Sequence, residues 1–331
     1  MTGSAASPSV LRANSWVPYA GLLVLFWGVW GAFSALPTKL YAYPDPMVYV
    51  VWSLTMLIPA WVSLRGKKFD RGRTAAGYGL LIGLTGAGGQ LLLFKALTIG
   101  PAYVIFPIVA LSPAITVLMA FGLLRERLGA LSWIGVVLAL VAIVLFSVST
   151  GDSSDSGWLY LLLSVLVCVA WGVQAFYMRK AALAGVDDAT TFGWMTISGL
   201  VLIPVAVLMM GGLPLGFPWQ APALTAGTQL LNAVGALFLV MAMSRGKASI
   251  VAPVTNALAP VLTIVLSLLV FGATPTAFQV AGIVLALVGS TLMVYRAEKS
   301  SEAVPSAEAP SAGAASTEAP STGAPSTGAA T

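Results

Sequence analysis

Long apolar runs separated by short polar segments occupy most of the chain. Most of these runs are about 20 residues long, the length that an α-helix needs to cross the hydrocarbon core of a membrane. They lack the alternation of apolar and polar residues that marks membrane-spanning strands. The pattern predicts about ten membrane-spanning helices, at residues 17–38, 46–64, 75–98, 102–124, 130–149, 158–180, 189–210, 222–244, 249–271 and 276–295.

Composition supports an integral membrane protein. Of the 331 residues, 58% are hydrophobic and 8% are charged, whereas about a quarter of a soluble protein is charged. The chain has no histidine and one cysteine, Cys168. This excludes a disulfide within the chain, a metal site of cysteines and histidines, and a histidine proton relay. We therefore predict no metal and no cofactor.

The basic residues follow the topology rather than forming a nucleic-acid surface. Short loops after the second, fourth, sixth and eighth predicted helices hold most of the arginines and lysines, whereas the opposite loops hold Asp45, Asp152 and Asp155. Basic loops face the cytoplasm in membrane proteins. The pattern predicts a multi-pass protein of the cytoplasmic membrane with both termini in the cytoplasm, and no nucleic-acid partner.

The two halves of the chain resemble each other. Trp27-Gly28-Val29 matches Trp171-Gly172-Val173, and ordered Gly and Pro matches continue through both halves. Further aligned pairs are Ala96 with Ala242, Gly100 with Gly246, Ala102 with Ala248, Pro107 with Pro253, Leu111 with Leu258, Pro113 with Pro260 and Gly135 with Gly282. An odd number of helices in each half makes equivalent helices cross in opposite directions, which is the inverted repeat of many secondary transporters.

The predicted fold class is an all-α integral membrane protein with two inverted five-helix repeats. The predicted segments are a cytoplasmic amino-terminal segment at 1–16, the first repeat at 17–149, an outer linker at 150–157, the second repeat at 158–296 and a disordered cytoplasmic tail at 297–331. The tail is rich in Ala, Pro, Ser, Thr and Gly, and such a segment buries too little apolar surface to fold alone.

These features resemble the EamA-type members of the drug/metabolite transporter superfamily. The resemblance rests on the repeat, on "WG" near the start of each half and on "LLRERLGALSWIGVVLALVAIVL" at the end of the first half. It implies a ten-helix bundle that moves small metabolites across the cytoplasmic membrane, often outward. The family usually carries a Gly-Glu pair in both halves, but here Glu126 is matched by Ala273 in "FGATP". A role that needs both acids is therefore in doubt.

Helices broken near the middle of the membrane predict where a solute binds. The helix-breaking candidates are Pro107, Pro113, Pro253 and Pro260. An interior proline frees a backbone carbonyl, which must find a partner or line a wet cavity; simple kinks around a core are the alternative. The candidate cavity residues around them are Tyr103, Thr255 and Asn256, with Gln90, Trp30 and Gln174 from other helices. Interhelical hydrogen bonding is the alternative role for the amides, and packing is the alternative for Trp27 and Trp171.

Two lysines fall outside the charge pattern. Lys39 stands beside Tyr41 and Tyr43, as an anchor at the membrane surface does, with a place at an outer vestibule as the alternative. Lys95 follows Gly88 by two helical turns, so it is expected on the close-packed side of its helix, facing either the cavity or the interface. Both lysines are cavity candidates, and facing inward they would favour a carboxylate or phosphate.

The function predicted is a secondary transporter of a small organic metabolite that works by alternating access. Intramembrane acids and histidines are absent from the predicted helices, which favours export, exchange or facilitated diffusion over proton coupling, with an anionic or zwitterionic solute. An enzyme is not predicted, because no paired acids or Cys/His set lies in the helices. A membrane scaffold or sensor that does not transport is the alternative. The predicted partners are a small-molecule solute and the lipid bilayer.

Overall fold

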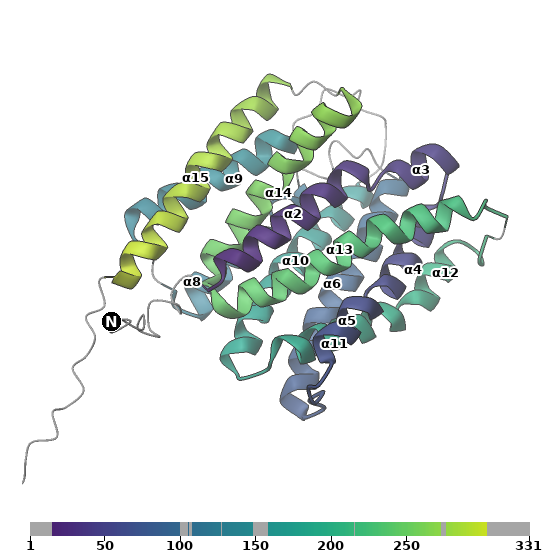
Figure 1. Ribbon diagram of the computed structural model, residues 1–331, viewed down its shortest axis with the longest axis horizontal. Coiled ribbons are helices and arrows are strands. Elements are labelled where there is room, and N and C mark those ends of the chain that lie inside the picture. Colours follow the sequence, from purple (N-terminus) through teal and green to yellow (C-terminus); the bar gives the residue numbers. More distant parts are fainter. Residues whose placement is uncertain are drawn as a thin grey trace, which may run out of the picture.

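The computed structural model describes residues 15–99, 105, 108–126, 128–147, 158–214, 216–272 and 276–302. All secondary structure in this part of the chain is helical (Figure 1), as the hydrophobic pattern predicts. The helices are α2 (Val17–Phe33), α3 (Leu36–Tyr41), α4 (Asp45–Thr55), α5 (Leu57–Leu64), α6 (Arg73–Ile99), α8 (Ser112–Leu123), α9 (Ala130–Ser147), α10 (Leu159–Leu183), α11 (Asp188–Val201), α12 (Ile203–Met209), α13 (Gln220–Arg245), α14 (Ala248–Phe271) and α15 (Ala277–Glu302).

Prolines mark where several of these helices begin. Pro37, Pro46 and Pro204 each occupy the first turn of a helix, in α3, α4 and α12. The first turn tolerates proline because its N–H groups have no partner inside the helix, and the ring already holds the helical φ angle. Short helices that follow one another form longer apolar segments: α2 with α3, α4 with α5, and α11 with α12.

Many of these helical segments are long enough to span a membrane. Seven helices among the described residues have the necessary length and apolar character: Val17–Tyr41, Asp45–Leu64, Arg73–Leu93, Leu159–Leu183, Asp188–Met209, Gln220–Arg245 and Ala248–Val270. Three further predicted spans coincide with the shorter apolar helices Ser112–Leu123, Ala130–Leu145 and Ala277–Met293. A multi-pass membrane protein is therefore supported. The count of ten spans stays a prediction, partly because the span at 102–124 includes residues outside the described part.

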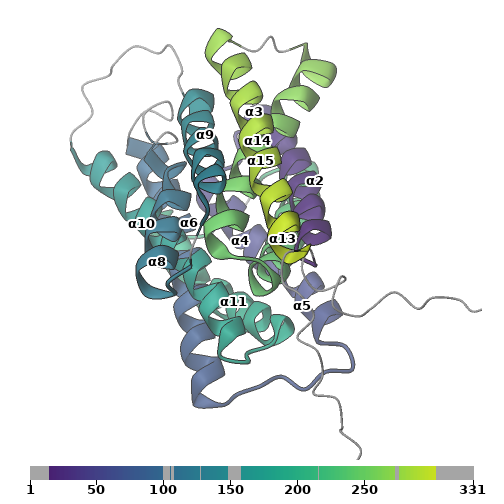
Figure 2. The same cartoon turned by 90° about the vertical axis from the view of Figure 1, so that its left-hand side faces the viewer.

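Each repeat packs its first helix against the other repeat. α2, from the first half of the chain, packs on α13 and α14, and α10, from the second half, packs on α6 and α8. The equivalent helices α9 and α15 lie side by side at one edge of the bundle (Figures 1 and 2). The two halves therefore interlock through their first helices.

Glycine permits the closest of these contacts. A methyl group at Gly28 of α2 would lie 2.6 Å from Leu262 Cδ2 of α14, and one at Gly172 of α10 would lie 2.5 Å from Ile115 Cβ of α8. These are equivalent contacts, because Leu262 aligns with Ile115 when Pro260 is aligned with Pro113. Small residues at such points let helix backbones approach in a membrane, where packing rather than the hydrophobic effect holds helices together.

Hydrogen bonds at these contacts repeat in the same way. Thr263 Oγ1 donates to the Gly28 carbonyl over 3.0 Å, and Thr116 Oγ1 donates to the Gly172 carbonyl over 3.0 Å. Each threonine comes from the helix that faces its glycine. The two halves thus share individual hydrogen bonds at equivalent positions, which supports the internal repeat predicted from the sequence.

One end of the bundle gathers charged side chains; we call it the arginine end and define it by Glu126, Arg179, Asp188 and Arg245. Arg245 forms an ion pair with Asp188 at 2.6 Å, and Arg179 Nη1 donates to the Ser244 carbonyl over 2.7 Å. The Glu126 carboxylate accepts from the backbone N–H of Ala248 and Ser249 and from the Ser249 hydroxyl. A carboxylate at the first N–H groups of a helix offsets its positive end, so Glu126 caps α14 from the loop that follows α8.

Two expectations, one about a helix break and one about a helix end, need correction. α14 runs without a break through Pro253 and Pro260, so these residues are interior prolines of one helix rather than helix-breaking positions. α15 extends to Glu302, because its helical pattern continues past the apolar run into polar residues. The predicted tail boundary at 297 therefore lies inside a helix, and residues 303–331 lie outside the described part.

We expect Gly28→Ala to lower the thermal unfolding temperature in detergent, because its methyl group meets Leu262. Overpacking of this kind costs about 1–3 kcal/mol. Gly21→Ala is the matched control on the same helix, since no atom lies within 4 Å of a methyl group there. Equal unfolding temperatures for the two variants would contradict the close contact between α2 and α14.

Candidate functional site

A cavity of about 810 Å³ lies at the interface of the two repeats. Its walls come from α2, α4, α6, α8, α10, α11, α13 and α14, together with Val109 and Ala110. Its volume falls within the range of small-molecule binding sites. Its polar wall is made mainly of indole and amide groups: Trp27, Trp30, Trp52, Trp171, Gln90, Gln174, Asn232 and Asn256.

The lining repeats the internal symmetry of the chain. Aligned pairs with the same side chain in both halves are Trp27 and Trp171, Leu93 and Leu239, Pro113 and Pro260, and Thr116 and Thr263. Aligned pairs with different side chains are Trp30 and Gln174, Gly86 and Asn232, and Gln90 and Ala236. Symmetric positions thus shape the cavity, whereas its amides are distributed asymmetrically.

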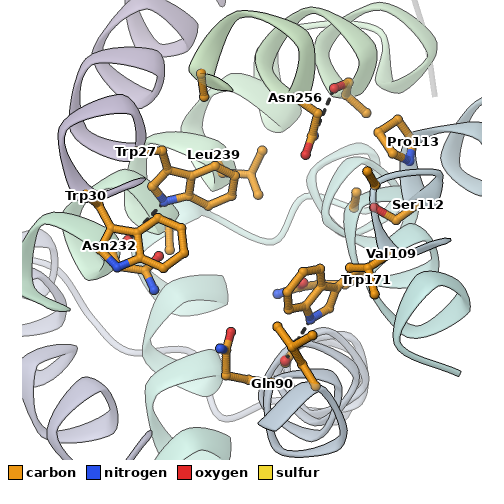
Figure 3. A pocket seen from close by; sticks show the side chains of 18 of the residues that line it. Trp27, Trp30, Gln90, Val109, Ser112, Pro113, Trp171, Asn232, Leu239 and Asn256 are labelled. Carbon is orange, nitrogen blue, oxygen red and sulfur yellow. Dashed lines mark hydrogen bonds between the residues drawn. The ribbon is translucent and has the colours of Figure 1, made fainter. Parts of the chain in front are cut away.

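Trp27 and Trp171 are held rigidly by equivalent bonds. Trp27 Nε1 donates to the Asn232 carbonyl over 3.2 Å, and Trp171 Nε1 donates to the Gly86 carbonyl over 3.2 Å. Methyl groups at Gly235 and Gly89 would collide with these two indoles. Figure 3 places the rings on opposite sides of the cavity. Both residues therefore pack against the opposite repeat and also line the cavity. The packing role that the sequence offered as an alternative is thus only part of what they do.

The indole nitrogens of the other two tryptophans are enclosed by protein. Trp30 Nε1 and Trp52 Nε1 are buried and have no hydrogen-bond partner among the described residues. The Trp52 side chain is 9% exposed. Buried polar groups in folded proteins nearly always have a partner. Other atoms of Trp30 and Trp52 line the cavity, whereas these two N–H groups are covered by the protein.

The asparagines present oxygen as well as nitrogen. Asn256 Nδ2 donates to the Ala252 carbonyl over 3.0 Å, and Asn232 Nδ2 donates to Gln229 Oε1 over 3.3 Å. An amide nitrogen bonded in this way leaves the Asn256 oxygen as an acceptor. Figure 3 shows Asn256 extending toward the space between Trp27 and Ser112. The cavity thus offers both donors and acceptors.

No charged side chain lines the cavity among the described residues. Lys39 and Lys95 are both exposed and contribute nothing to its wall. Lys95 shares its face of α6 with Gly88, where a methyl group would meet no atom within 4 Å. The expectation that this face is close-packed was therefore wrong: Gly79, Gly83, Gly86 and Gly89 make the close contacts of α6 with α10 and α11, and Gly88 does not.

Apart from the two lysines, the predicted site residues divide into three groups. Trp30, Gln90, Gln174, Asn256, Pro113 and Pro260 line the cavity. Thr255 and Pro253 are buried but do not line it, and Thr255 Oγ1 donates back to the Val251 carbonyl of its own helix. Tyr103 and Pro107 lie outside the described residues. Binding of a solute by any of these side chains stays a prediction.

Sequence reasoning missed part of the wall. Trp52 and Met56 of the α4 region and Met195 of α11 reach the cavity, but their helices carry no matched motif that could have marked them. Asn232, a polar residue in a predicted span, also lines the cavity and aligns with Gly86.

The helix break predicted in the fourth span is partly visible. Ile108 and Val109 are helical, Ala110 and Leu111 form a turn, and α8 begins at Ser112 with Pro113 in its first turn. The Leu111 N–H donates to the Ile108 carbonyl, and the Ala114 N–H donates to the Leu111 carbonyl. The break therefore shapes the wall while its backbone N–H groups remain largely satisfied.

Comparison with known proteins gives three findings. The family model of the EamA-like transporters matches residues 14–148 and 158–295, which are the two repeats. An uncharacterised protein of Methanocaldococcus jannaschii is 29% identical over 137 residues, which cover 40% of this chain and 94% of that protein. A solved crystal structure superposes with a TM-score of 0.68 at 20% identity, covering 86% of this chain and 98% of the other; at this identity the match shows the fold alone.

We expect a cysteine at Asn256 to react with a water-soluble thiol reagent, whereas a cysteine at Thr255 does not. The two positions are neighbours on α14, but Asn256 lines the cavity and Thr255 is 0% exposed. Both variants are made in a Cys168→Ala background and assayed by mass shift after labelling. Equal labelling of the two would contradict the assignment of this wall.

Proposed function

Because the chain belongs to the EamA-like transporter family, we propose that it moves a small organic solute across the membrane by alternating access through the cavity between its repeats. The family indicates a membrane transporter of small solutes, a class that is generally not enzymatic. The mode of transport and the site are our proposal.

The matched lining of the cavity carries this proposal. Inverted-repeat transporters place the solute at the repeat interface, so that one repeat can move against the other around a central site. Here Trp27 and Trp171, and likewise Thr116 and Thr263, meet the cavity from equivalent places in the two halves. A scaffold or sensor would have no need of a cavity built in this way.

The arginine end supports a state closed on one side. Glu126 joins the end of α8 to the start of α14, and Arg245 joins α13 to α11 through Asp188. In alternating access the contact of Glu126 with α14, which joins the two repeats, must break when its end opens. The residue that aligns with Glu126 is Ala273, which has no carboxylate, so the opposite end cannot form the same cap.

The direction of transport and the location are also part of the proposal. The basic residues of the loops near Glu126 favour a cytoplasmic arginine end under the positive-inside rule, with both termini on that side of the cytoplasmic membrane. The absence of acids within the predicted spans favours export, exchange or facilitated diffusion over proton coupling. The anionic or zwitterionic solute predicted from Lys39 and Lys95 loses its support, since neither lysine lines the cavity.

Flux through proteoliposomes tests the transport function. We expect radiolabelled solute to equilibrate across vesicles that contain the protein, and Ala236→Phe to abolish this flux by filling the cavity. Ala281→Phe, at an exposed position of α15, is the matched control and should transport normally. Vesicles that move no member of a panel of amino acids, organic acids, nucleosides and neutral heterocycles would support the scaffold instead.

The cap by Glu126 gives a separate test of alternating access. We expect Glu126→Ala to increase labelling of a cysteine at Asn256 several-fold when an impermeant thiol reagent is added on the arginine-end side of the membrane. Loss of a cap costs about 1 kcal/mol, which is several-fold in a two-state equilibrium.

Two observations complete this test. Lys67→Ala, an exposed loop substitution, should leave labelling unchanged. An equal increase from both sides of the membrane would indicate general loosening of the bundle and would argue against a gate at Glu126.

A further inference from the structure

We propose that the loop between α5 and α6 binds the headgroup of an anionic phospholipid through Arg65 and Arg71. This inference goes beyond the proposed function, because it concerns the outer surface of the bundle and holds whether or not the cavity carries a solute. It depends on the charge of the loop at residues 65–73, on the stacking of its two arginines, and on the apolar helix face beside it.

The charge of this loop is not neutralised within the protein. Its nine residues include one acid, Asp70, and five exposed basic residues: Arg65, Lys67, Lys68, Arg71 and Arg73. None of the five forms an ion pair in the part of the chain that the structure describes. The Asp70 carboxylate instead accepts from the Gly72 N–H over 2.7 Å. The loop therefore presents an excess of positive charge to an anion outside the chain.

Other arginines at this end of the bundle are already engaged. Arg245 pairs with Asp188, and Arg179 donates to the Ser244 carbonyl. The positive-inside rule explains why basic residues gather on one side of a membrane, but it requires no particular arrangement of them. The exposed arrangement in this loop therefore calls for a reason beyond topology.

The two arginines of the proposed site stack on aromatic rings. Arg65 Cζ lies 4.4 Å from the centroid of the Trp61 ring, and Arg71 Cζ lies 6.0 Å from that of Phe69. A guanidinium that rests on a ring by its face keeps its N–H edge for a planar or bidentate acceptor. Phosphate oxygens are acceptors of this kind. Stacking thus holds two phosphate-binding edges ready at the surface.

Contacts with α11 fix the position of the loop. The rings of Phe69 and Trp194 lie 5.2 Å apart between centroids, and Trp194 Nε1 donates to the Asp70 carbonyl over 3.2 Å. The Asp70 N–H donates to Thr190 Oγ1 over 3.2 Å. A site that is already ordered loses less entropy when its ligand binds. The loop is therefore prepared for binding in a way that a free basic segment is not.

The position of the loop favours a lipid over a soluble anion. It joins the apolar segment that ends at Leu64 to the one that begins at Arg73, and it runs along one end of the bundle (Figure 2). The exposed side chains of α5 just before it are apolar: Leu57, Ile58, Trp61 and Val62. Tryptophan is enriched where a membrane meets water.

These features match the two parts of one phospholipid. An acyl chain that lies along the exposed face of α5 brings its phosphate to the level of Arg65, one turn after Trp61. A soluble phosphate has no use for the apolar face. Basic residues next to a membrane-spanning helix attract anionic lipid headgroups. The loop and α5 together therefore fit an anionic phospholipid.

Native mass spectrometry of the purified full chain in detergent tests the lipid class. The probes are phosphatidylglycerol, phosphatidylcholine with the same acyl chains, and glycerol 3-phosphate, which has the phosphate without the chains. We expect phosphatidylglycerol to bind about tenfold more tightly than either of the others, since only it combines net charge with acyl chains. Equal binding of phosphatidylglycerol and phosphatidylcholine, or equal binding of glycerol 3-phosphate, would overturn the proposal.

Paired substitutions test the two arginines. We expect Arg65→Gln with Arg71→Gln to weaken phosphatidylglycerol binding about twentyfold, because each basic residue near an anionic headgroup contributes about fivefold. Lys39→Gln with Arg125→Gln is the matched control, which removes the same charge from two exposed residues outside the loop. Its affinity should stay within about twofold of the unsubstituted chain, since bulk charge alone acts weakly at a distance. Equal losses in the two variants would show that net charge alone binds the lipid.

A charge-preserving variant tests the stacked geometry. We expect Arg65→Lys with Arg71→Lys to lose about threefold in affinity, because lysine keeps the charge without the planar fork. Unchanged affinity would contradict the role given to the guanidinium groups. Binding of a polyglutamate peptide that depends on Arg65 and Arg71, without a preference for phosphatidylglycerol, would assign the loop to an acidic protein segment and overturn the lipid.

Discussion

Close contacts between helices of the two repeats depend on residues that lack a side chain. Gly28 meets Leu262, and Gly172 meets Ile115, at distances that no other residue could accommodate without displacement. Because these contacts join α2 to α14 and α10 to α8, they bind each repeat to the other rather than to itself. Packing must supply this association in a membrane, since lipid is as apolar as the helices.

The cavity is a consequence of the same contacts. Once the glycine faces meet, the indoles of Trp27 and Trp171 lie over Gly235 and Gly89 and donate to backbone carbonyls across the interface. The wall of the space between them includes residues that differ between the repeats, such as Trp30, which aligns with Gln174. Symmetry thus accounts for the shape of the site, and departure from symmetry accounts for its chemistry. A solute whose two sides carry different polar groups suits a wall of this kind.

Much of the fold could be predicted because it depends on local patterns. Apart from the start of α8 and the end of α15, the helices begin and end within a few residues of the predicted runs, since apolar length and first-turn prolines are properties of the chain itself. The site was predicted less well. Gln174 and Asn256 were found as polar groups in apolar helices, whereas Trp52 and Met195 resemble ordinary packing residues. Lys95 was misjudged, because periodicity places it with Gly88 but cannot say whether that face meets a helix or the surroundings.

The sequence by itself determined a helical membrane protein with two related halves, and it determined which residues are equivalent between them. Periodicity, composition and repeated glycines and prolines are readable without any contact. The tertiary structure alone decided that the equivalent tryptophans cross to the other repeat, that Glu126 caps α14 and that the cavity wall carries no charge among the described residues. These facts depend on which helix faces meet, and that choice is made by packing between segments far apart in the chain.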